Sequence, residues 1–143
     1  MRLSRESRYA IEALTALAGH APGEVVEARQ IAEEASLPPA FLHKILRQLA
    51  VAGIVTSRRG AGYALARGPH AITVSQVLDA IEGEAALETR CIFWREDCSN
   101  EAPCELHFRW RELRPVIQRT LDDTTIADVR TANEPFLAVP ERG

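Results

Sequence analysis

The feature that most constrains the fold is the order of three short segments between residues 28 and 65. Apolar residues at helical spacing predict one short helix over 28–35 and a second over 39–52, joined by a tight turn. Residues 54–65 then contain two short β-type runs around a glycine-containing tip, which is the pattern of a hairpin. A helix-turn-helix unit followed at once by a basic hairpin predicts a winged helix.

Further helices are predicted on both sides of this unit. Residues 4–19 carry apolar side chains at helical spacing and end in a glycine. A threonine followed three residues later by a glutamine forms a capping-box motif in front of a helix over 74–81. A long helix is expected over 103–121, and a last capped helical turn is expected over 124–129, with a loose tail from Asn133 that contains Pro135.

The predicted fold class is mainly α with a small β-hairpin wing. We divide the chain into a winged-helix domain (1–82), a cysteine-bearing loop (83–103), a dimerisation helix with its closing turn (104–130) and a flexible tail (131–143). An apolar stripe on the long helix can pack on the domain, but that domain already has its own core, so we favour pairing with a second copy. The stripe consists of Leu106, Trp110, Leu113, Ile117 and Leu121.

Charge is distributed unevenly along the chain. Residues 1–67 hold nine Arg and Lys against six Asp and Glu, a net charge of +3, whereas residues 68–143 hold eight against fourteen, a net charge of −6. A basic half beside an acidic half is typical of a DNA-binding unit joined to a sensing or assembly unit. The sequence therefore favours double-stranded DNA as a partner although the whole chain is acidic.

The candidate DNA-binding residues lie on the second helix of the unit and on the hairpin. Side chains of the helix that the core does not use can meet base edges and phosphates in the major groove. Hairpin arginines can enter the minor groove or bind phosphate. Ordinary solvated charges are the simpler interpretation, but the basic residues coincide with the recognition helix and the wing. The candidates are Pro39, Ala40, His43, Lys44, Arg47, Arg58 and Arg59.

All three cysteines fall within fourteen residues, in the pattern Cys91-x6-Cys98-x5-Cys104-x2-His107. An odd number of clustered thiols argues against a disulfide framework and indicates a metal site or a redox-active thiol. Iron–sulfur clusters and zinc both take thiolate ligands, and imidazole can replace a thiolate on iron. We expect Cys104 and His107 to share the opening turn of the long helix, where both can face one site.

No segment of the sequence predicts export or membrane insertion. Glu6 and Glu12 interrupt the apolar stretch that a signal peptide would need after the N-terminal arginines. No run approaches the roughly 18 apolar residues of a membrane span. We therefore expect a soluble, cytoplasmic protein.

These residues together resemble the IscR/NsrR/RirA family of winged-helix iron–sulfur regulators, over nearly the whole chain to about Val129. The most specific part of the resemblance is the three cysteines followed by a histidine. The matching segments are Met1-Arg2-Leu3-Ser4, Arg8-Tyr9-Ala10, Phe41-Leu42 with Ile45-Leu46, Gly53-Ile54-Val55, Ser57 with Arg59-Gly60, Cys104-x2-His107-x2-Trp110-Arg111-x-Leu113 and Thr125-Ile126-Ala127-Asp128.

The resemblance implies a homodimer that crosses its long C-terminal helices and carries a cluster near the dimer interface. It implies a 2Fe–2S cluster on Cys91, Cys98, Cys104 and His107. The first cysteine gap is one residue longer than in the IscR members, which leaves a 4Fe–4S cluster open. Some family members complete the cluster with an N-terminal side chain, so Glu6 and Glu12 are rival fourth ligands.

The predicted function is a homodimeric DNA-binding transcription regulator of a palindromic operator that senses cluster status, redox state or nitric oxide. The alternative is a zinc-bound or cluster-free thiol sensor with the same DNA-binding half. An enzyme with Cys104 as nucleophile and His107 as its base ranks below both, because the sequence offers no group to orient the imidazole.

Overall fold

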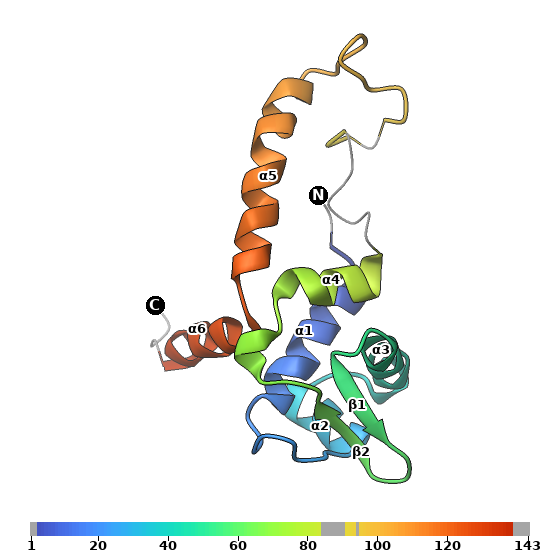
Figure 1. Ribbon diagram of the computed structural model, residues 1–143, viewed down its shortest axis with the longest axis vertical. Helices are drawn as coiled ribbons and strands as arrows, with labels where there is room; N and C mark the ends of the chain where they lie inside the picture. Colours follow the sequence, from blue (N-terminus) through green and yellow to red (C-terminus); the bar gives the residue numbers. More distant parts are fainter. Residues whose placement is uncertain (1–2, 84–90, 94, 139–143) are drawn as a thin grey trace, which may run out of the picture.

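The computed structural model describes residues 3–83, 91–93 and 95–138, and Figure 1 shows its helices and strands. Parts of the predicted cysteine loop (84–90 and 94) and of the predicted tail (139–143) lie outside the described residues, as do Met1 and Arg2. The elements are α1 (Arg5–Leu17), α2 (Ala28–Ala35), α3 (Pro39–Val51), β1 (Val55–Arg58), β2 (Gly62–Leu65), a 3-10 turn η1 (Pro69–Ala71), α4 (Val74–Glu82), α5 (His107–Asp123) and α6 (Ile126–Ala138).

The predicted fold class is confirmed. Helices α1 to α4 and the β1–β2 hairpin form one body with a continuous apolar core, to which α3 contributes Leu42, Ile45, Leu46 and Leu49. The strands pair antiparallel, with Val55 opposite Leu65. Figure 1 shows α5 extending away from this body, with the cysteine-bearing segment at its far end.

Polar contacts define both ends of α4, and those at its C-terminal end join it to α1. At its C-terminal end, Glu82 accepts hydrogen bonds from the Ser4 backbone N–H at 2.8 Å and from the Ser7 hydroxyl at 2.7 Å. Partial burial raises the pKa of Glu82, but these hydrogen bonds outweigh it and hold the pKa below its ordinary value. The predicted capping box between Thr73 and Gln76 is present at its N-terminal end.

The start of α5 differs from the sequence expectation. The helix begins at His107 and not at Pro103, because the chain first makes a tight turn in which the Cys104 carbonyl accepts the His107 N–H at 3.2 Å. Cys104 therefore precedes the helix, and the prediction that it shares the opening turn of α5 with His107 is wrong.

The last helix is longer than the sequence indicated. Thr125 caps it, since its hydroxyl accepts the Asp128 N–H at 3.1 Å, but α6 continues to Ala138 and does not end at Val129. Pro135, interpreted as part of a loose tail, lies within α6, as Pro115 lies within α5. A proline removes one backbone hydrogen bond, and both helices continue past it.

Gly62 in β2 sits against the chain just before α2. Val26 and Tyr63 exchange two backbone hydrogen bonds of 2.8 and 2.9 Å, which join this segment to the hairpin. A Cβ on Gly62 would lie 2.2 Å from the Val26 carbonyl oxygen, and the residue has φ +134°. Gly60, at the hairpin tip, also has positive φ (+76°), but a Cβ there would meet open space.

We therefore expect Gly60→Ala and Gly62→Ala to differ sharply in stability. Gly60→Ala should lower the free energy of unfolding by about 1 kcal/mol, the cost of a left-handed backbone for an L-residue. Gly62→Ala should cost at least about 3 kcal/mol, because it adds a clash with backbone to a strained φ. Urea unfolding of both variants measures the difference; equal reductions in stability would contradict the described packing of the wing.

Candidate metal centre and nucleic-acid interface

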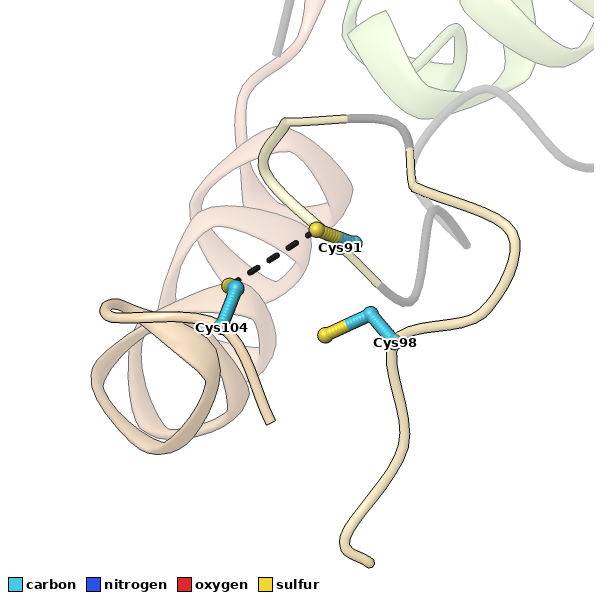
Figure 2. A group of neighbouring side chains, drawn as sticks. All are labelled: Cys91, Cys98 and Cys104. Atoms are coloured by element: carbon cyan, nitrogen blue, oxygen red, sulfur yellow. Dashed lines mark hydrogen bonds between the residues drawn. The ribbon is translucent and has the colours of Figure 1, made fainter. Parts of the chain in front are cut away.

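The three cysteine side chains converge at one point beside the start of α5 (Figure 2). Cys91 and Cys98 come from the irregular segment before the helix, and Cys104 comes from the turn that leads into it. Their sulfur atoms all lie within 4.8 Å of one another, and the Cys91 and Cys104 sulfurs are 3.8 Å apart. Each residue is at most 7% exposed. The thiols form a small buried cluster separate from the main core.

Turns in the segment direct the thiols inward and the charged side chains outward. The Cys98 N–H donates to the Arg95 carbonyl at 3.4 Å, and the Ser99 hydroxyl accepts the Ala102 N–H at 3.1 Å. Arg95 and Asp97 pair on the exposed side at 3.0 Å. Among residues 91–93 and 95–106, the charged side chains are exposed and stay outside the cluster, and the thiols face one another.

The thiols differ in acidity for local reasons. Burial raises the pKa of Cys91, but backbone N–H groups at Arg95 and Phe93 stabilise its thiolate and bring the pKa below its ordinary value. The backbone of Cys104 lowers the pKa of Cys98, but burial and the neighbouring thiols outweigh it and raise that pKa overall. Ionisation is therefore easier at Cys91 than at an ordinary thiol and harder at Cys98.

His107 lies beside the cysteines as the first residue of α5. Its Nδ1 is 3.2 Å from the Cys98 sulfur, its Nε2 is 2.9 Å from the Asn100 side-chain oxygen, and the residue is buried. Of the rival ligands, Glu12 on α1 pairs with Arg8 at 2.9 Å. Within the part of the chain that the structure describes, the one group of clustered ligand residues consists of the cysteines, with no carboxylate among them.

The donor set fits a thiophilic metal. Sulfur ligands select zinc, copper(I) and iron–sulfur centres over magnesium or calcium, which prefer oxygen. Three converging, buried thiols with an imidazole at the edge supply that soft set. The cluster can therefore bind a metal.

The second candidate surface lies on α3 and the hairpin. The apolar side of α3 faces the core, and its other side leaves Pro39, Ala40, His43, Lys44 and Arg47 exposed. Arg58 at the end of β1 and Arg59 at the tip are exposed as well. A shallow hollow of about 570 Å³ runs along this side of α3. All seven sequence-predicted residues are thus accessible from outside.

Two polar residues near these surfaces escaped the sequence analysis. The Arg5 guanidinium lies over the Phe41 ring at 5.2 Å and near the Tyr9 ring at 6.0 Å, beside the start of α3. The Asn100 side chain is hydrogen-bonded to His107, which lies seven positions later in the chain. A cation–aromatic contact between two helices and a loop-to-helix hydrogen bond carry no spacing signal that a sequence pattern could reveal.

The apolar stripe of α5 is divided between two environments. Trp110, a member of the predicted stripe, is only 4% exposed, so it is already buried within one chain and presents little surface to a second copy. Leu113 is 49% exposed and Val116, which was not in the predicted stripe, is 52% exposed. These two residues lie on a helix that contacts the body through α4.

Among the described residues, no helix combines the length and the apolar character that crossing a membrane requires.

Comparison with known proteins identifies the family of the chain. Residues 3–132 match the Rrf2 family, described as "Iron-dependent Transcriptional regulator". IscR of Vibrio parahaemolyticus is 31% identical over 136 residues, which covers 94% of this chain and 80% of that protein. The structure of T. potens IscR has a TM-score of 0.72 at 28% identity and covers 100% of this chain and 94% of its own.

CymR of B. subtilis, described as a global cysteine regulator, has a TM-score of 0.73 at 27% identity, covering 92% of this chain and 97% of its own. The family match spans the winged-helix body, the cysteines and α5. These relatives are transcription regulators and not enzymes. The chain belongs to the Rrf2 family of transcription regulators.

Proposed function

We propose that the chain acts in the cytoplasm as a homodimeric regulator whose affinity for a palindromic DNA operator depends on an iron–sulfur cluster. Cys91, Cys98, Cys104 and His107 would hold the cluster. The observation that carries this proposal is the convergence of three buried sulfurs within 4.8 Å, with the His107 Nδ1 3.2 Å from one of them. The iron dependence in the family description supports iron over zinc.

The ligand spacing also favours a cluster over a single zinc ion. Structural zinc sites usually begin with two ligands two to four residues apart, and the gaps between these cysteines are six and five residues. An irregular segment with such gaps can wrap around a larger group. A mixed thiolate–imidazole set on iron resembles the 2Fe–2S centres of higher potential; we favour 2Fe–2S and keep 4Fe–4S open. When bound, the cluster would supply a redox-active centre that reports iron supply, oxidants or nitric oxide.

Contacts at the far end of α5, together with the packing of α4 on α3, support a coupling between this site and the proposed DNA-binding surface. Near its C-terminal end, α5 joins α4 through Gln118, which donates to the Ser75 hydroxyl at 3.0 Å, and through the hydrogen bond between Ser75 and Asp122. Backbone hydrogen bonds from Val74 to Thr124 (2.8 Å) and from Ile126 to Ile72 (2.9 Å) reinforce this junction. A cluster that changes the position of α5 can therefore shift α4 and the body that contains α3.

The exposed part of α5 is our proposed dimer interface. Leu113 and Val116 present apolar surface on a helix that extends away from the body. Pairing two such helices would bury these side chains and place two α3 helices on one DNA duplex. A dimer of helix-turn-helix units reads half-sites about 34 Å apart, which is the geometry of a palindromic operator.

The second candidate function is the zinc-bound or cluster-free thiol sensor. The lowered pKa of Cys91 and its 3.8 Å distance from the Cys104 sulfur favour it, because thiolate character and a neighbouring thiol promote oxidation. Colour separates the two functions: an iron–sulfur protein absorbs visible light, and a zinc-bound or metal-free protein does not.

DNA affinity should fall steeply with salt and depend on α3 and the wing. Arg47→Ala and Arg59→Ala should each remove one charge that binds phosphate, and each should therefore reduce the slope of log affinity against log salt by about one. Fluorescence anisotropy on operator DNA at several salt concentrations measures the slope. Arg119→Ala on α5 removes the same charge elsewhere and should leave the slope unchanged. If the Arg47 and Arg59 variants also keep the wild-type slope, this surface does not contact DNA.

Leu113→Asp should convert the dimer to monomers. The substitution would bury a charge in the proposed apolar interface, where an unpaired carboxylate is strongly unfavourable. Val51→Asp is the matched control, because Val51 is 92% exposed and lies on α3 away from α5. Light scattering should give half the wild-type mass for the first variant and the wild-type mass for the second. A dimeric Leu113→Asp protein would exclude this helix as the interface.

Alanine at Cys91, Cys98 or Cys104 should abolish or destabilise the visible chromophore of anaerobically prepared protein. His107→Ala should change both its spectrum and its reduction potential, whereas His107→Cys should keep a cluster at lower potential, since thiolate adds negative charge. Glu6→Ala and Glu12→Ala should leave both properties unchanged. If His107→Ala left the spectrum and the reduction potential unchanged and one glutamate variant altered both, the fourth ligand would lie on α1.

A further inference from the structure

The side chain of Asn100 links the metal-binding segment to α5 through a single oxygen atom. Its Oδ1 is 2.9 Å from the Nε2 of His107 and 3.3 Å from an Nη1 of Arg111. His107 and Arg111 are four residues apart on the same face of α5. Both donors therefore reach the same acceptor from one helix.

The contact with Arg111 identifies the protonation pattern of His107. A guanidinium group donates hydrogen bonds and has no acceptor, so the Asn100 atom that it contacts must be the oxygen and not the amide nitrogen. The same oxygen faces Nε2, which must then carry a hydrogen. In neutral imidazole the other nitrogen, Nδ1, is left with its lone pair. That lone pair faces the Cys98 sulfur at 3.2 Å.

We propose that Asn100 is a positioning residue that holds His107 in the Nε2–H tautomer and thereby assigns Nδ1 as the metal-ligating atom. The inference rests on the proposed function only in placing His107 at a metal site. Metal-bound histidines generally donate their second N–H to a carboxylate, a carbonyl or water, which orients the ring. An amide oxygen performs this role here without adding negative charge next to three thiols.

The arrangement also makes the ligand geometry depend on α5. Arg111, one turn further along α5, also donates a hydrogen bond to the Asn100 oxygen. A displacement of α5 relative to the loop would therefore weaken the contact between Asn100 and His107. If Asn100 only held the loop against α5, the same distances would be found, but replacing Asn100 would change neither the tautomer of His107 nor the metal affinity. The tautomer and the metal affinity therefore distinguish a positioning role from a purely structural one.

The first test uses reduced, metal-free protein, so it does not depend on the identity of the metal. The ¹⁵N shifts of the His107 ring are measured at about pH 8, above the ordinary titration range of imidazole. We expect the Nε2–H tautomer in wild type and in Asn100→Asp, which keeps an acceptor, and a mixture in Asn100→Leu. Circular dichroism confirms that the variants fold. A predominant Nδ1–H tautomer in wild type, or no change in Asn100→Leu, would overturn the proposal.

The second test measures binding of Zn²⁺ by the same proteins in competition with a chromophoric chelator. Removing a partner of this kind typically weakens metal affinity about 10–100-fold. Asn100→Leu should show that decrease, and Asn100→Asp should retain wild-type or higher affinity. Equal Zn²⁺ affinity in Asn100→Leu and wild type would overturn the role of Asn100. Failure of the iron–sulfur proposal would appear separately, as colourless wild-type protein that still shows this pattern with Zn²⁺.

Discussion

The electrostatic cost of ionising three buried thiols side by side is the physical constraint on which the candidate metal centre depends. Sulfurs within 4.8 Å of one another cannot all ionise without cost, and burial together with the two thiol neighbours raises the pKa of Cys98. A bound metal reverses this cost, because it stabilises coordinated thiolates. Among the described residues, the cysteines form a buried cluster of their own that stands apart from the main core. Metal binding is thus the interaction that best accounts for bringing the cysteines together.

The location of the three cysteines supports the proposed coupling between the metal site and the DNA-binding surface. The cysteines lie at one end of α5, and the other end of α5 is hydrogen-bonded to α4 through Ser75, Gln118 and Asp122. In turn, Glu82 at the end of α4 holds the start of α1. Couplings between sites are typically worth about 1–3 kcal/mol. The proposed regulation requires a coupling of that size through α5, and the proposed dimer joins two copies through the exposed apolar part of the same helix.

The sequence predicted local structure well and contacts between segments poorly. The ranges of α2 and α3 and the capping box of α4 follow from apolar spacing and short-range hydrogen bonds, which a linear pattern contains. The turn at Cys104 and the burial of Trp110 depend on how the loop folds against α5, so spacing alone placed them wrongly. The clustering of the cysteines was predicted from proximity in the chain, but the hydrogen bond that orients His107 comes from Asn100, a residue with no motif of its own.

The most direct test of the central claim is the metal content of wild-type protein purified under strict anaerobiosis. Iron and acid-labile sulfide are quantified per chain, and a visible spectrum is recorded from the same sample. The proposed function predicts a coloured protein with iron and sulfide in equal amounts, and bleaching with release of both on exposure to oxidant or chelator. A colourless protein that contains zinc, or no metal, after the same preparation would contradict the iron–sulfur assignment and favour the thiol sensor.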